Sequence, residues 1–442
     1  LTGSASDSQG IDVQAFGVAA AGGAAAGLVL GVAQHDSQVS LLVSPGATLS
    51  ASDITLASSS QGPVALKAQG AAGGLAVGLN ASVLVARDAS SATLDVGNGA
   101  KLLAGNGINL SARATPQVKA ESLGVALGGA VGAGATVIDA IANATARLSL
   151  AANSQLQAKS ASLAAQITRN GDNDTLNIKG IGVSGGIGLS ANAVVATARN
   201  GSTALLESAD SSLFTGLAND GTWSFQAATD VRQRASVEGY AAGLLTLGAS
   251  GAKVTSTTAT QALIGGRFAG ASGTLKVGAT AVVDNLARAT AGQGGLISGA
   301  ASMAITGDTG TTKARLYARG TDDSSNRNAL FKAVELSALH QSLFNAFVDS
   351  VNASLVGASG AHAQNDLTLT TSSELAAGSR LDTYAYTQGA KALVSKAQSS
   401  DYNVRSGSGG VVDAAAAQSV STLALNTNAL VGANAYLHLI GD

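Results

Sequence analysis

The sequence predicts an all-β fold, a repetitive parallel β-helix (β-solenoid) built from about eight units with loop insertions. Three observations lead to this prediction: glycine pairs that recur at a regular interval, a second motif after each pair, and a two-residue periodicity inside each unit. The unit is about 54 residues long, and a regular period of that length is typical of solenoids and arrays. We expect residues 1–442 to form one continuous stack.

The glycine pairs mark the start of successive units. They stand at positions 22–23, 73–74, 128–129, 185–186, 294–295 and 409–410. The first steps are 51, 55 and 57 residues, and the later steps of 109 and 115 residues each equal about two periods. Ala242-Gly243 occupies the intermediate position in the first of these longer steps.

A second motif follows each glycine pair, as in "SATLDVGNGAKLLAGNGINLSAR" (91–113) and "NATARLSLAANSQLQAKSASLAAQ" (143–166). Short polar stretches such as "SPGA", "GNGA" and "AANS" interrupt its apolar runs. Gly and Asn tolerate the positive φ that tight corners require, so we expect turns at these places.

Within a unit, the apolar residues alternate with small ones. In "GGLAVGLNASVLVA" (73–86), the odd positions from 75 onward hold Leu, Val and Ala, whereas the even positions hold Gly, Ala, Asn and Ser, with Leu84 as the exception. Alternation with period two places the two sets on opposite faces of a β-strand. The same division returns in "GGIGLSANAVVATA" (185–198), so we expect strands throughout.

Composition and charge narrow the classes of partner. The most helix-like apolar segment, residues 17–33, carries no charge, but its larger residues Val18, Leu28, Leu30 and Val32 share one parity, as a strand requires. We therefore expect no membrane insertion.

The net charge is −2 and the cations are scattered, whereas nucleic-acid binding depends on clustered cations. We expect no nucleic-acid partner.

Two geometries satisfy this pattern. If one rung takes about 20 residues, each unit holds two to three rungs, and eight units make a rod on the order of 75–115 Å long. Alternatively, each unit forms one very wide coil of long strands, and the stack is several-fold shorter.

Two segments depart from the regular unit. The unit around residues 312–352 is enlarged, and its "TDDSSNRN" stretch predicts an inserted loop. We favour strands with this loop over a short helix, although Leu330, Val334, Leu343, Phe347 and Val351 would share one helix face. Residues 168–180, "TRNGDNDTLNIKG", predict a second loop, and loops are where a rod would carry binding determinants.

The residues with chemical potential are few. His35, His340, His362 and His438 lie far apart without a second ligand at metal-binding spacing, so we interpret them as surface or strand residues. Asp172 and Asp174 in "GDNDT" resemble the start of a calcium loop but lack its glycine and its distant glutamate, which favours a polar turn. We expect no catalytic residue, no cofactor-binding residue and no metal ligand.

Two other functions remain as alternatives. A β-helix enzyme that degrades polysaccharide needs a carboxylate cluster, for which Asp322 and Asp323 with neighbouring rungs are the candidates. A solenoid that binds ice or another crystal surface needs a flat Thr-x-Thr ladder, and only "TLTTSS" (368–373) comes close.

Units of the form "GGxxxGxNAxVxxA…TAxLxxGAxLxAGxxxLxA", best seen at 73–113, resemble the shaft repeats of large bacterial filamentous adhesins exported by two-partner secretion. These are the filamentous-haemagglutinin-like and leukotoxin-type exoproteins. The resemblance implies a right-handed parallel β-helix, an outer-membrane transporter during export, and secretion or display on the cell surface or in the biofilm matrix. The shaft of that family has no catalytic residues, and its type example has shorter repeats, of roughly 20 residues.

On this basis we expect a structural, non-enzymatic shaft segment that supports cell–cell, biofilm or host adhesion. Its partners would be polysaccharide, neighbouring cells or a host surface receptor, bound through Ser, Thr and Asn side chains on the outer face. The absence of cysteine suits a chain that crosses an outer membrane unfolded. Because the chain starts at Leu1 without a leader, we expect a piece of a longer, processed protein.

Overall fold

The computed structural model describes residues 1–218, 220–271, 273–320, 329–396 and 403–441. These residues form strands and turns and include no helix, which confirms the all-β class. All strands belong to one hydrogen-bonded sheet, and their pairings are parallel. The apolar segment 17–33 lies in two strands, and the described residues contain no helix able to cross a membrane.

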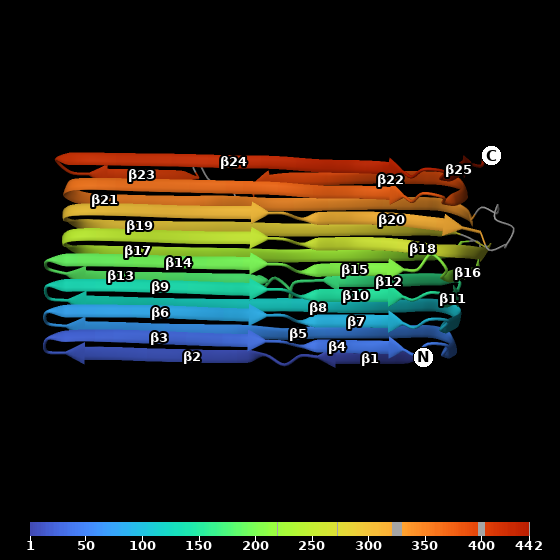
Figure 1. Ribbon diagram of the computed structural model, residues 1–442, viewed down its shortest axis with the longest axis horizontal. Coiled ribbons are helices and arrows are strands. Elements are labelled where there is room, and N and C mark those ends of the chain that lie inside the picture. The colour runs from blue at the N-terminus through green and yellow to red at the C-terminus, as the bar shows by residue number, and fades with distance from the viewer. Residues whose placement is uncertain (219, 272, 321–328, 397–402, 442) are drawn as a thin grey trace.

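Each strand pairs with the strand one whole unit later in the sequence. Thr2 pairs with Thr55, an offset of 53 residues, and the offsets elsewhere run from 52 (Thr222 with Thr274) to 62 (Ala161 with Trp223). One rung therefore takes a whole unit, and the narrow helix with several rungs per unit is wrong. Figure 1 shows the consequence: the longest dimension of the molecule lies along the strands and not along the stack.

Each turn of the chain, which we call a coil, has two long legs and a short third side (Figure 1). The first leg leads to a tight turn at one end, the tip, which in the first coil is Gly22-Gly23. The second leg returns to the opposite end, the base, where the chain turns again at Gly46, Gly99 or Asn153. These three residues have positive φ angles of 71°, 68° and 56°, as the turn motifs predicted.

The strands follow this path coil by coil. The first four coils and the start of the fifth contain β1 (Thr2–Asp7), β2 (Ile11–Ala21), β3 (Ala24–His35), β4 (Gln38–Val43), β5 (Thr48–Gly74), β6 (Val77–Asp88), β7 (Ser91–Val96), β8 (Lys101–Gly128), β9 (Val131–Ala142), β10 (Thr145–Leu150), β11 (Gln155–Ala158), β12 (Ser160–Ile167), β13 (Leu176–Gly186), β14 (Leu189–Asn200), β15 (Thr203–Ser208) and β16 (Leu213–Leu217). The later coils contain β17 (Thr222–Ser256), β18 (Ala259–Ala271), β19 (Thr274–Asp308), β20 (Thr311–Arg319), β21 (Ala329–Leu375), β22 (Arg380–Lys396), β23 (Val404–Gly409), β24 (Val412–Val431) and β25 (Tyr436–Leu439).

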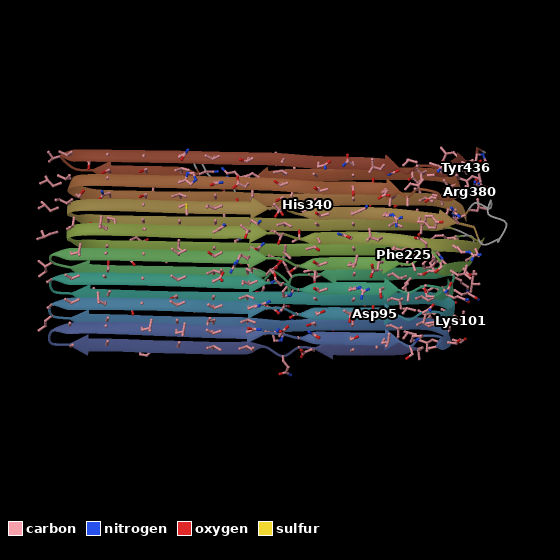
Figure 2. All side chains as sticks on the ribbon, viewed as in Figure 1. Asp95, Lys101, Phe225, His340, Arg380 and Tyr436 are labelled. Atoms are coloured by element: carbon pink, nitrogen blue, oxygen red, sulfur yellow. The ribbon has the colours of Figure 1, made fainter. Side chains whose placement is uncertain are left out.

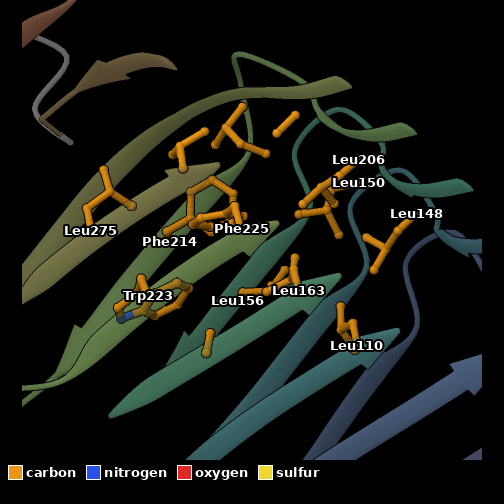
Figure 3. Packing of buried hydrophobic residues seen from close by; sticks show 14 of the residues in the cluster. Leu110, Leu148, Leu150, Leu156, Leu163, Leu206, Phe214, Trp223, Phe225 and Leu275 are labelled. Carbon is orange, nitrogen blue, oxygen red and sulfur yellow. The ribbon is translucent and has the colours of Figure 1, made fainter. Parts of the chain in front are cut away.

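The base holds the large side chains of the core. Leucine and isoleucine columns from successive coils pack there around Phe214 (Figure 3). The centroid of the Phe214 ring lies 5.3 Å from that of Phe225, 4.9 Å from that of Phe268 and 5.8 Å from that of Trp223. The three sides of the coil enclose a wider interior at this end, and only large residues fill it to the density of a protein core.

Toward the tip the interior becomes thin and polar. Ser82 Oγ lies 2.7 Å from Ser122 Oγ on the opposite leg, and Asn80 Nδ2 donates to the Gly70 carbonyl at 3.3 Å. A Cβ on Gly70 would lie 2.7 Å from Asn80 Oδ1. The glycines of one leg thus leave room for the polar side chains of the other, and the two legs approach closely.

The enlarged unit is built from strands. Leu330, Val334, Leu343, Phe347 and Val351 all lie in β21, so the helix alternative is wrong and the strand prediction is confirmed. The "TDDSSNRN" stretch (321–328) lies outside the described residues. The second predicted loop is present between β12 and β13, at residues 168–175, whereas residues 176–180 already belong to β13.

The two glycines of a tip turn differ in how closely other backbone atoms approach them. A Cβ on Gly74 would lie 2.1 Å from the Val77 carbonyl oxygen and 2.8 Å from that of Gly23, whereas a Cβ on Gly73 meets nothing within 4 Å. We expect Gly74→Ala to lower the free energy of unfolding by about 2 kcal/mol, because rigid backbone must move to admit the methyl group. Urea titration followed by circular dichroism measures this.

The adjacent Gly73→Ala variant is the matched control and should change the free energy of unfolding by less than about 0.5 kcal/mol. Equal losses in the two variants would contradict the close backbone approach at Gly74.

Candidate functional site

The structure divides the four histidines into two classes. His362 and His438 lie on outer faces, and His438 Nδ1 is 3.2 Å from Asp382 Oδ1. His35 and His340 point into the stack, where they are 6% and 0% exposed. All four lie on strands, as expected, but the two buried ones are each paired with a buried aspartate, which the sequence did not reveal.

The first buried pair joins β3 and β6. His35 Nδ1 lies 3.2 Å from Asp88 Oδ1, and the two residues face each other in register in consecutive coils. Asp88 also accepts hydrogen bonds from the Ser90 hydroxyl at 2.5 Å, the Ser90 amide at 3.0 Å and the Gln117 amide at 3.1 Å. A Cβ on Gly62 would lie 2.0 Å from His35 Cε1, so the imidazole occupies space that this glycine leaves.

The second buried pair lies in later coils, midway along the coil (Figure 2). His340 Nε2 is 3.2 Å from Asp308 Oδ2, and His340 Nδ1 is 3.0 Å from Thr312 Oγ1. Gly310 again leaves the space, since a Cβ there would lie 2.0 Å from His340 Cε1. Here the histidine comes from the first leg and the aspartate from the second, so the pair holds the two legs together.

Neither pair has the access that nucleophilic catalysis requires. A hydroxyl, an imidazole and a carboxylate meet at each place, but Ser90 and Thr312 are fully buried. At the first pair the Ser90 hydroxyl donates to Asp88 and also lies near the same imidazole nitrogen, so the histidine does not bridge the other two groups as a general base would. Both clusters are structural polar contacts inside the stack.

Burial raises the pKa of the Asp88 carboxyl above its usual value, although the hydrogen bonds from Ser90 and His35 oppose this shift. Removing a carboxylate from water disfavours its charged form. The three neighbouring donors explain how an aspartate can occupy this position at all.

The remaining acidic candidates do not form a metal site. Asp174 lies 3.6 Å from the Arg232 guanidinium and accepts a hydrogen bond from Asn177 at 3.0 Å, and Arg232 also donates to the Asp172 carbonyl. A guanidinium at this place opposes a bound cation and supports the polar turn. Among the residues that the structure describes, no group of three His, Asp or Glu side chains could hold a metal ion. Asp322 and Asp323 lie outside the described residues.

In the candidate ice-binding segment, Thr368 and Thr370 form the Thr-x-Thr pair and point outward, and Thr370 is the register partner of Thr311 in the coil before. Thr371 and Ser373 point into the stack and are fully buried. Near the tip, polarity is inverted relative to our expectation: Asn80, Ser82 and Asn192 are buried, whereas the branched apolar residues of the same strands face outward. The prediction of Ser and Asn on the outer face is wrong for this region.

The outward apolar residues of the second legs form columns across the coils. Between two such columns runs a shallow groove of about 920 Å³, whose lining comes from seven coils and is almost wholly apolar. The groove floor is a column of small residues: Ala81, Ala135, Ala193, Ala249, Ala301 and Gly360. This groove is a candidate binding surface on the described part of the chain.

Comparisons with protein-family models, with curated proteins and with solved structures find no match for this chain. The resemblance to filamentous adhesins therefore remains a prediction from the repeat pattern.

The buried Asp88 predicts a pH dependence of stability. Its folded pKa is raised, so the stability that it contributes is complete below about pH 4, the unfolded pKa, and is lost as the pH rises through the folded value. We expect Asp88→Asn to remove this loss. Urea midpoints measured from pH 4 to pH 7 would give a flatter profile for the variant than for the unmodified chain.

Asp95→Asn, on the outer face of β7, is the control and should keep the original profile, since the buried carboxyl is unchanged. If the urea midpoint of Asp88→Asn varied with pH as steeply as that of the unmodified chain, the Asp88 carboxyl would not be the source of the pH dependence.

Proposed function

We propose that this chain is a β-solenoid and that it works as a shaft segment of a secreted or surface-displayed bacterial filamentous adhesin. The observation that carries the proposal is the in-register parallel pairing of successive coils over the length of the legs. Such a stack gains stability from nearest-neighbour contacts and can be lengthened without a new core.

The surface charges near the base support a load-bearing role. Arg147 in the third coil contacts Asp95 of the coil before it at 3.6 Å and Glu207 of the coil after it at 2.6 Å. Arg234 and Asp284, which lie farther along the first leg, form a similar bridge between later coils. Each exposed pair contributes little stability, but a shift of register would separate all of them together.

An adhesive function agrees with the absence of an accessible catalytic cluster in the described residues. Contacts with polysaccharide, neighbouring cells or a host receptor would come from the polar outer faces near the base, where individual contacts are weak and many copies give avidity. Export through an outer-membrane transporter agrees with the absence of cysteine, since no disulfide would form before passage.

A mechanical measurement tests the shaft. Pulled between its termini by force spectroscopy, the chain should unfold in steps that release one coil each, about 53 residues or roughly 180 Å of extended chain. The step follows from the whole-unit offset of the hydrogen-bond ladder. Steps near 70 Å, the extended length of about 20 residues, would contradict the wide coil.

A binding measurement tests the adhesin. Beads coated with many copies should adhere to bacterial cells or to immobilised polysaccharide far more strongly than the single chain does. Release of soluble sugar products from the polysaccharide would contradict the proposal and favour the enzyme alternative.

A further inference from the structure

The outer face of the second legs near the tip carries four columns of uncharged residues, which we call the tip face. The first column is a ridge made of Val77, Val131, Leu189, Leu245, Ile297, Val356 and Val412. The second contains Leu79 and Leu247 among small residues such as Ala133, Ala191 and Gly299, the third is the small-residue groove floor described above, and the fourth includes Val83, Val137, Val195, Met303 and His362. Large members of these columns are well exposed, Leu247 by 54% and Val412 by 60%.

The tip face is large enough for a stable interface. Eight coils at about 4.8 Å and the first three columns at about 6.8 Å give roughly 800 Å² on one molecule. Burial of these three columns against an equal surface would remove about 1,600 Å² from water, which is the size of a standard protein–protein interface. Exposed apolar patches of this size mark interaction sites.

The shape of the tip face also points to packing of sheet on sheet. The strands run side by side from the first coil to the last with little rotation (Figure 1), and flat sheets of many strands are typically stabilised by stacking. No Lys, Arg, Asp or Glu interrupts the four columns. The nearest charges lie at the border of the face: Asp139 and Lys253 stand in the next column, and Asp139 forms an ion pair with Arg199.

We propose that the tip face binds the tip face of a second copy of this chain about a two-fold axis that lies along the column of Leu79 and Leu247. This axis places the ridge of Val77 and Leu245 opposite the groove floor of Ala81 and Ala249, because both columns lie two residues from the axis. Each coil then faces the same coil of the partner, and the contact is isologous.

Three properties favour a second copy over other occupants. The ridge and the groove repeat once per coil, about 4.8 Å, and a second stack has the same period. The four columns contain no Phe, Tyr or Trp side chain on which sugar rings could stack, and no Lys or Arg side chain within the face that would hold an anionic lipid surface. The association is independent of the proposed adhesin function, since either could fail without the other.

A cysteine cross-link tests the geometry. The chain contains no cysteine, so Leu247→Cys would introduce a single thiol beside the proposed axis. Under mild oxidation we expect a disulfide-linked dimer from Leu247→Cys and none from Ala228→Cys, the matched control on the opposite outer face of the same coil. A dimer in solution without this cross-link would overturn the proposed axis.

A charge substitution tests the association itself. Ala249→Glu places a carboxylate on the groove floor, and we expect it to weaken dimerisation by at least about 100-fold in sedimentation equilibrium. Ala228→Glu, on the other face, should leave the dissociation constant unchanged. A chain that stays monomeric at all concentrations overturns the proposal, and so does a monomer that binds neutral lipid vesicles through the tip face.

Discussion

The rest of the structure depends on one constraint, the parallel hydrogen-bond ladder that joins each residue to its counterpart one coil later. The ladder runs through the strands of the described residues, from the pairing of Thr2 with Thr55 to that of Arg380 with Tyr436. Since each coil satisfies its backbone only through its neighbours, residues at the same position of successive coils must tolerate stacking at about 4.8 Å. Columns of like residues are the direct result.

The columns explain how one coil can have three different environments. Large apolar columns fill the three-sided base, where the aromatic residues around Phe214 collect. Small polar columns, such as that of Asn80 and Asn192, lie between the closely spaced legs near the tip. The branched residues that cannot fit between these legs face outward, and they create the apolar surface for which we propose a second copy as partner.

The stack also explains the buried ionisable pairs. His35 and Asp88 differ by 53 residues and are register partners, so the repeat period itself held the signal for that pair. His340 and Asp308 come from opposite legs, and no spacing in the sequence indicates their contact. Leu84, the one residue that broke the alternation of its strand, is fully buried and marks the inward face that the other large residues of the strand avoid.

The sequence by itself determined the β-structure, the repeat length, the turn residues and the alternation, because each depends on local backbone preferences and on chemical periodicity. Only the tertiary structure decided how many residues form one rung and which parity faces inward. Both depend on the distance between the two legs. Near the tip that distance favours glycine, alanine and short polar side chains, as the contact between Ser82 and Ser122 shows, and Val29 and Val194 are the buried exceptions in the column of Ser82. Most of the branched apolar set therefore faces outward, even though it would be the more favourable set to bury.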